Sequence, residues 1–284
     1  MTHLHLDYAI PDAALSDYIT VFYRFRSDLP DLEETERADR AQIRFVLHDG
    51  GGEYRFADGR VQQAMDVHIV GPTTGPRVIC ADRPVHVFGA GLTPCGWAAL
   101  IGVDASTMVN RLVDAADLFG DRVIAAREAL RAAADLAGMQ AIATALLLEL
   151  LRDSCSDTLR FVRQVNDWLA AHPSPDIESL IGATGLSRRQ LERNCNRLYG
   201  MPPKFLARKY RALRAAVSLI LDGDSLDEVI DRGFYDQSHL IREIREFTGL
   251  TPRQLKADPG RIAALSVGLR HNLSGQIDPL VSDA

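Results

Sequence analysis

The sequence predicts an α+β protein of two domains: a β-barrel with accompanying helices, followed by an all-α domain that holds two helix-turn-helix units. Three observations lead to this prediction. Short runs rich in Val, Ile, Phe and Tyr, separated by turn residues, fill about the first 105 residues. Apolar residues at helical spacing follow. The last third holds an imperfect repeat, in which residues 180–206 and 229–255 share glycine, leucine and proline at offsets of 48 and 49 residues.

The predicted strands are short and closely spaced. Clusters of Gly, Pro and Asp at residues 49–52 and 71–72 separate them, a pattern typical of a barrel or sandwich. The charged segment 31–40 is expected to be a loop. The predicted strands span residues 17–25, 42–48, 53–56, 67–71, 77–80 and 85–92.

Two helices are predicted at residues 125–137 and 139–151. Leucines cover much of the circumference of the second helix, so it must be buried on more than one side. Packing on the barrel plus a partner subunit would satisfy this, and so would burial within its own domain. The chain is therefore divided into a first domain at 1–152, a linker at 153–158, an all-helical domain at 159–258 and a tail of mixed signals at 259–284.

Each copy of the repeat has the layout of a helix-turn-helix unit, with a short helix, a turn that opens on glycine, and a second helix stopped by glycine and proline. In the first copy Ser187 precedes the second helix, where its hydroxyl can cap exposed backbone amides. Two such units in one chain indicate a protein that reads duplex DNA at two successive places. The residues expected to face the core are Leu191, Cys195 and Leu198 in the first unit and Leu240, Ile244 and Phe247 in the second.

The distribution of charge favours nucleic acid, although the whole chain carries a formal charge of −6. Between Ser187 and Arg214 nine basic residues accompany a single acidic residue, so this stretch carries +8 and the rest of the chain −14. A solvated helix face would look the same, but the stretch coincides with a helix expected to read DNA. The residues expected to contact phosphates are Arg188, Arg197, Lys204, Arg208, Lys209, Arg211 and Arg245.

The motifs GLSRRQLERNCNRLYGMPP and GFYDQSHLIREIREFTGLTP resemble the two helix-turn-helix units of the AraC (AraC/XylS) family of bacterial transcription regulators. The resemblance covers about 100 residues, with Cys195 standing where the family prefers Phe. It implies a sequence-specific, cytoplasmic regulator of transcription, either activator or repressor, with double-stranded DNA as partner and RNA polymerase as a second partner if it activates. By position in the motifs, it places base contacts on Arg189, Glu192, Arg193, Gln237, Ser238 and Arg242.

The segments at residues 71–76 and 91–121 resemble, more faintly, the degenerate cupin-like sensor domain of some members of this family. Such a domain binds a small effector or mediates dimerisation, so we expect an effector and a homodimer formed through residues 125–151. The same aromatic residues and histidines that could line an effector pocket would equally fill a closed core. They are Tyr54, Phe56, His68, His86, Phe88 and Trp97.

Neither catalysis nor a metal or other cofactor is expected. His48, Glu53, His68 and His86 are dispersed and form no ligand cluster inside a strand. The longest apolar run, at residues 141–151, is too short to cross a bilayer, so no membrane partner is expected.

Two alternatives to effector control rest on cysteine. The four cysteines are scattered without a CxxC pair and are expected to be reduced thiols. A thiol-based redox sensor would use Cys95 or Cys155, and an Ada-like methyl acceptor would need a metal-activated cysteine among Cys80 and Cys95. The sequence specifies neither an effector nor an operator.

Overall fold

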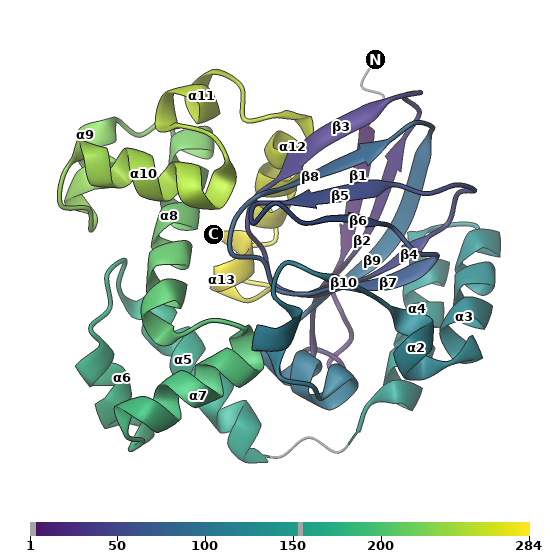
Figure 1. Cartoon of the computed structure of the whole chain (residues 1–284), viewed down its shortest axis with the longest axis horizontal. Coiled ribbons are helices and arrows are strands. Elements are labelled where there is room, and N and C mark those ends of the chain that lie inside the picture. The colour runs from purple at the N-terminus through teal and green to yellow at the C-terminus, as the bar shows by residue number, and fades with distance from the viewer. Residues whose placement is uncertain (1–3, 153–155) are drawn as a thin grey trace.

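The computed structural model describes residues 4–152 and 156–284, and it places a strand-rich front half before a helical rear half, as predicted (Figure 1). The strands form two antiparallel sheets, ordered β1-β2-β9-β4-β7-β10 and β3-β8-β5-β6. Their bounds are Leu4–Ala9 for β1, Ile19–Ser27 for β2, Leu32–Glu36 for β3, Gln42–Val46 for β4, Glu53–Phe56 for β5, Val61–Gln63 for β6, Val67–Val70 for β7, Arg77–Ala81 for β8, Val85–Leu92 for β9 and Leu112–Asp114 for β10.

The larger sheet has one apolar face and one polar face, because successive side chains on a strand point to opposite sides. On β4, Ile43 and Phe45 join the apolar core, whereas Gln42 and Arg44 face the space between the two sheets. The register with β9 continues this division, since Phe45 lies opposite Phe88 on the apolar face. The larger apolar core therefore lies outside the pair of sheets rather than between them.

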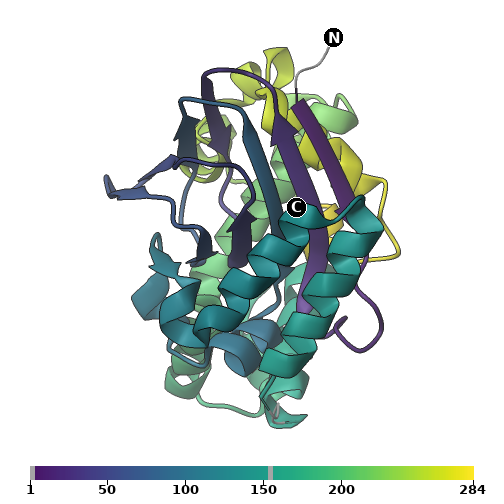
Figure 2. The same cartoon turned by 90° about the vertical axis from the view of Figure 1, so that its right-hand side faces the viewer.

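Helices cover that apolar face (Figure 2). The two long ones, α3 and α4, begin a few residues earlier than predicted, and Leu148 of α4 stays 45% exposed. The bounds are Pro94–Gly96 for α1, Trp97–Ile101 for the π-helix η1, Ala105–Met108 for the 3₁₀-helix η2, Ala115–Phe119 for α2, Asp121–Ala132 for α3 and Leu136–Leu150 for α4.

The rear half contains both predicted helix-turn-helix units. The first is α6 and α7, the second is α9 and α10, and the long helix α8 joins them. The bounds are Ser156–Ala171 for α5, Ile177–Thr184 for α6, Arg188–Tyr199 for α7, Pro203–Leu221 for α8, Leu226–Asp231 for α9, Gln237–Thr248 for α10 and Pro252–Ala257 for α11. Among the described residues, no helix combines the length and apolar character needed to cross a membrane.

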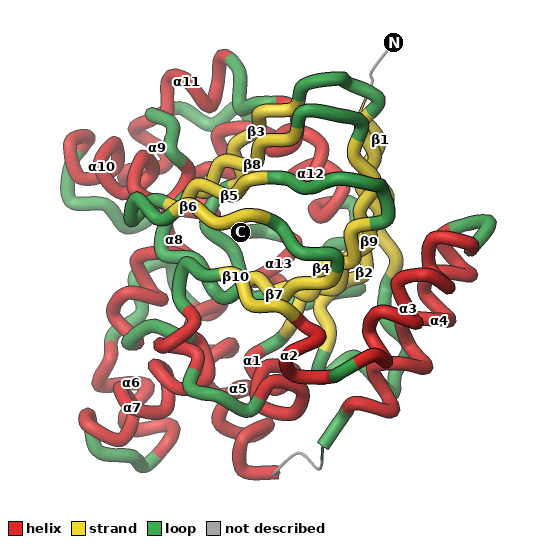
Figure 3. Tube along the Cα trace, turned by 45° about the vertical axis from the view of Figure 1, so that its right-hand side comes forward, coloured by secondary structure: helices red, strands yellow, loops and turns green. Residues whose placement is uncertain are grey.

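Two segments differ from the prediction. Residues 31–40 are not simply a loop, because β3 begins at Leu32 and pairs with β8, with Leu32 and Glu34 buried and Glu33 exposed. The tail forms helices α12 (Arg261–His271) and α13 (Pro279–Ser282), which lie between the strands and α8 (Figure 3). Three residues of the predicted linker, 153–155, lie outside the described part of the chain, and α5 already begins at Ser156.

The two halves meet along a seam of backbone contacts. Lys209 of α8 is 2% exposed and donates to the carbonyl oxygens of Asp39, at 2.7 Å, and Thr73, at 2.9 Å. At the end of α10, the carbonyl oxygen of Phe247 accepts from the backbone amide of Ala38 at 2.8 Å. Helix α10 thus ends against the front half.

Gly200 ends α7 and also lies in the seam, where it packs against the front half. Gly200 has φ of +79°, and a β-carbon added there would lie 2.7 Å from Cγ of Pro72 and 2.9 Å from Cγ2 of Val109. Gly185, which ends α6, has φ of +66° but open space around it.

We expect Gly185→Ala to cost about 1–2 kcal/mol in the free energy of unfolding, the strain of a left-handed alanine. Gly200→Ala should cost more, because it also pushes α7 away from the front half. Urea unfolding of both variants measures the difference. Equal losses would show that the seam tolerates a methyl group at this place.

Candidate nucleic-acid interface and adjoining cavity

The first recognition helix, α7, is fixed at both ends and leaves one charged face open. Ser187 and Gln190 form a reciprocal capping box at its start. Leu191, Cys195 and Leu198 are buried, as predicted, so the opposite face is turned to solvent. The side chains predicted to read bases there are all exposed, namely Arg189, Glu192 and Arg193.

The second recognition helix, α10, repeats this arrangement. Asp236 caps it by accepting from the amide of His239, and Leu240, Ile244 and Phe247 are buried. Gln237, Ser238 and Arg242 are exposed, as base reading requires. The structure adds Tyr235, which lies in the turn before the helix and is 91% exposed. The sequence did not indicate it, because an aromatic residue in a turn gives no periodic signal.

A buried carboxylate ties α10 to α8. Glu243 is 1% exposed and accepts from Arg208, at 2.7 Å, and from Arg211. Burial alone would raise the pKa of Glu243, but the hydrogen bonds and charges of the two arginines hold it below its usual value. A second acidic residue of α10, Glu246, also pairs with Arg208. These contacts fix the relative placement of the two helices.

The predicted phosphate contacts fall into two groups. Arg197, Lys204 and Arg245 are exposed, and their side chains form no hydrogen bond or ion pair within the described residues. Arg188, also exposed, pairs with Glu178. The others are engaged inside the protein, because Arg208 and Arg211 bind Glu243, while Lys209 lies in the seam. The prediction for Lys209 is therefore corrected, since its ammonium group is covered by the front half.

A groove runs between the two units. Residues of both recognition helices and of α8 line it, including Arg188, Lys204, Arg208 and Arg242. Of the six predicted base readers, Arg242 lines this groove, and the carboxylate of Glu243 lies among the cations of its lining.

A second hollow, here called the cavity, lies between the two sheets and is roofed by α12. Its volume is about 80 Å³. Leu6, Phe25, Ile79 and Val87 give it apolar walls, and a band of charged and polar side chains crosses it. The cavity therefore combines an apolar lining with strong hydrogen-bonding groups, as ligand sites commonly do.

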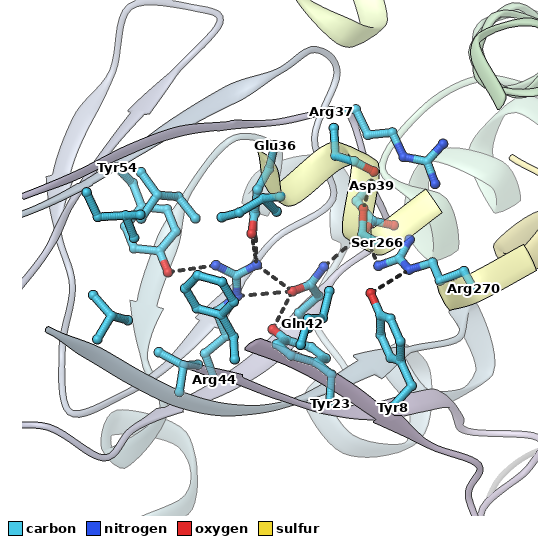
Figure 4. A pocket seen from close by; sticks show the side chains of 18 residues that line it. Tyr8, Tyr23, Glu36, Arg37, Asp39, Gln42, Arg44, Tyr54, Ser266 and Arg270 are labelled. Carbon is cyan, nitrogen blue, oxygen red and sulfur yellow. Dashed lines mark hydrogen bonds and ion pairs between the residues drawn. The ribbon is translucent and has the colours of Figure 1, made fainter. Parts of the chain in front are cut away.

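Hydrogen bonds cross the cavity as a continuous chain (Figure 4). Arg44 donates to Tyr54, to Glu36 and to the amide oxygen of Gln42 at 2.8 Å. The Gln42 amide donates to Asp39 at 3.0 Å. Asp39 also accepts from Arg270 of α12 at 3.0 Å, and Arg270 donates to Tyr8 at 3.1 Å.

Positive charge exceeds negative charge on the cavity wall, where Arg37, Arg44 and Arg270 accompany Glu36 and Asp39. Burial would raise the pKa of Asp39, yet Arg270 and Arg37 hold it far below its usual range. Arg37 itself has no hydrogen-bond partner at its buried Nη1, and burial together with Arg270 lowers its pKa to about 10. Arg37 therefore has no carboxylate that pairs with it alone, because Asp39 is bonded to Arg270.

Only one of the six predicted pocket residues, Tyr54, lines the cavity. Two lie close behind it, since His68 hydrogen-bonds to the hydroxyl of Tyr54 at 3.1 Å and Phe56 stacks on the ring of Tyr54. Phe88 and Trp97 belong to the apolar core beneath the helices, where the alternation of β9 directs Phe88. His86 follows Val85 on the other side of β9 and hydrogen-bonds through its backbone to His48. Five of the six predicted residues therefore do not line this cavity, and the prediction of an effector pocket stays a prediction.

The cysteine alternatives gain little from the structure. Cys95 is 2% exposed, and burial raises the pKa of its thiol to about 12, which disfavours the reactive thiolate. Cys155 lies outside the described residues. Within the described ranges, no three His, Cys, Asp or Glu side chains gather closely enough to hold a metal ion.

Comparison with known families separates the two halves. Residues 180–258 match the model of a helix-turn-helix domain family, and residues 8–114 match a domain family of unknown function. The F1 operon positive regulatory protein of Yersinia pestis is 36% identical over 85 residues, which are 30% of this chain and 28% of that protein. The match thus spans well under half of the relative's length.

Solved structures resemble the chain over most of its length. A single-residue variant of ToxT from Vibrio cholerae, in its apo form, has a TM-score of 0.48 and 9% identity, over 90% of this chain and 98% of ToxT. The AraC-like transcriptional activator CuxR has a TM-score of 0.30 and 15% identity, over 80% of this chain and 91% of CuxR.

The burial of Lys209 makes the stability of the seam depend on pH. Burial lowers the pKa of Lys209 to about 7; the nearby Asp39 opposes this shift, and Arg40, Arg77 and Arg37 add to it. In the unfolded chain the amine keeps a pKa near about 10.4. Between pH 7 and 10 the unfolded state therefore binds more protons, and stability rises with pH.

We expect the wild-type chain to gain free energy of unfolding relative to Lys209→Met as pH rises from 7 to 9. The slope should be at most about 1.4 kcal/mol per pH unit, the value for one proton. Urea unfolding of both proteins at several pH values measures it. The difference should be flat below pH 6, and a difference that is constant throughout would contradict the burial of this amine.

Proposed function

We propose that this chain, whose residues 180–258 are a helix-turn-helix domain of the AraC type, is a sequence-specific DNA-binding transcriptional regulator. The family of this domain consists of regulators, which are generally not enzymes. The proposal includes action in the cytoplasm and contact with RNA polymerase if the chain activates transcription.

The observation that carries the proposal is the shared character of the two recognition helices. Both α7 and α10 bury an apolar stripe and expose, on the opposite face, side chains that can hydrogen-bond to base edges. Arginine binds guanine through O6 and N7, and glutamine binds adenine through N6 and N7. We assign base reading to Arg189, Glu192, Arg193, Gln237, Ser238 and Arg242.

Phosphate binding is assigned to the exposed cations around these helices. Arg197, Lys204 and Arg245 have no partner within the described residues, and Arg188 has only an exposed one. Exposed ion pairs are weak, so Arg188 can exchange Glu178 for a phosphate. The exposed ring of Tyr235 adds a surface that can pack against a sugar or a thymine methyl group.

We further propose that the cavity takes a small organic anion as effector. Its support is the unpartnered Nη1 of Arg37, the excess of guanidinium groups and the apolar walls. A carboxylate would supply the missing counter-charge, and a hydrocarbon portion would occupy the apolar side.

We also propose that the chain forms a homodimer through α3 and α4. The outer faces of these helices carry small exposed side chains, among them Ala129, Ala141 and Ala145, together with the exposed Leu148. A second copy of the same helix pair could approach this surface closely at the alanines, because their side chains are short.

Arg193→Ala tests the reading of DNA. The variant should lose about 1–3 kcal/mol of binding free energy and relax the preference at one base pair. Fluorescence anisotropy would be measured on a duplex selected from random sequences by the wild-type chain, and on its single-base variants. Arg160→Ala is the matched control, because Arg160 is also exposed but lies on α5, where it pairs with Asp157. Unchanged affinity and unchanged base preference would remove α7 as a reader.

The effector proposal is tested with a panel of small carboxylic acids and their primary amides. At least one acid should raise the unfolding temperature of the wild-type chain while its amide does not, since binding to the folded state stabilises it. Arg37→Gln should abolish that shift, and Arg131→Gln should keep it, because Arg131 pairs with Asp49 at the surface. Equal stabilisation by acids and amides would show that charge is not recognised.

A further inference from the structure

We propose that residues 260–284, here called the C-terminal segment, form the movable wall of the cavity and couple its occupancy to DNA binding. This inference rests on the proposed function, and it concerns the regulation of the same cavity. It is carried by three features: what the segment covers, how it is held, and to what it is joined.

The segment covers the cavity directly. Ile262, Ala263, Ser266 and Arg270 of α12 line it, opposite strands of both sheets. At about 80 Å³ the cavity is smaller than the roughly 150 Å³ that accommodates one benzene ring. An effector of that size or larger therefore needs a wall to yield, and α12 is the one helix among the described residues that lines the cavity.

Polar contacts hold both ends of α12. Glu34 accepts from Arg261 and from the backbone amide of Ile262, at the start of α12. Arg270 pairs with Asp39 near the other end. Between them, Ile262 packs into a small apolar cluster with Leu4 and neighbouring residues. Breaking the buried pair of Arg270 and Asp39 is costly by itself, but an anion in the cavity would compete with Asp39 for Arg270 and keep that guanidinium group paired as α12 moves.

The segment is joined to both helix-turn-helix units. Three residues separate α11, which follows the second unit, from α12. Beyond α12, Asp278 accepts from Asn166 of α5 and from Arg40, and Leu280 joins the apolar cluster of the first unit. A shift of α12 therefore acts on one unit through the chain and on the other through packing.

The seam also contains Asp39, with which the C-terminal segment forms an ion pair through Arg270. Asp39 binds Arg270 with its carboxylate, and its carbonyl oxygen accepts from Lys209 of α8. The neighbouring Arg40 donates to Tyr210 of α8 at 2.9 Å. One short stretch of chain thus touches the cavity, the C-terminal segment and the helix that joins the two units.

A large side chain introduced into the cavity occupies space as an effector would, so the test does not need the effector to be known. Ala263→Phe places a ring on the cavity side of α12, whereas Ala264→Phe makes the same change one residue further, on the exposed side. We expect Ala263→Phe to change the dissociation constant for the selected duplex at least about threefold and to speed amide hydrogen exchange in α12. Ala264→Phe should leave both at the wild-type values.

Arg270→Ala serves as a second variant in case Ala263→Phe prevents folding, and circular dichroism establishes folding for each. It should change the dissociation constant in the same sense as Asp39→Asn, and the double variant should go no further than either single one, since both remove one ion pair. The proposal is overturned if folded Ala263→Phe and Arg270→Ala bind the duplex as Ala264→Phe does. Failure of the wild-type chain to select any duplex would overturn the proposed function instead.

Discussion

The architecture depends on pairing charges that folding has enclosed. Asp39 lies where the sheets, α8 and the C-terminal segment meet, and its carboxylate, backbone amide and carbonyl oxygen are all engaged. A buried charge without a partner is costly, so each element that carries a partner is held in place by that cost. The front half cannot move from the rear half without exposing or orphaning several of these groups together.

The same requirement explains why the interior between the sheets is polar. Arg44 and Arg77 share Glu36, and Gln42 accepts from both Arg44 and Tyr23. Networks of this kind specify one arrangement when every member is satisfied. Arg37 and Arg77, each with a buried Nη1 that has no hydrogen-bond partner, are therefore informative, because they mark where the network is incomplete.

Local features of the fold could be predicted from the sequence, while features made by distant contacts could not. The capping box of α7 and the buried stripe of Leu191, Cys195 and Leu198 depend on neighbours in the chain, and the cap and the stripe were both predicted. The pairing of β3 with β8 and the docking of α12 depend on distant partners, and neither of these was predicted. The pocket prediction relied on aromatic character, but the direction of a strand side chain follows its register, which places Phe88 on the far side from Arg44. The basic stretch likewise gave no sign that Lys209 would be covered by the front half.

At the ends of α7 and α10 the seam consists of glycines packed against the front half. Gly200 ends α7 against Pro72 and Val109, and Gly249, with φ of +83°, ends α10 with its would-be β-carbon 3.3 Å from Cγ of Pro76. Recognition there is a matter of shape, and it does not depend on which bases the exposed faces read. The reading faces of α7 and α10 could therefore be exchanged for others of different specificity, and the front half would still dock, provided that both helices continue to end in glycine.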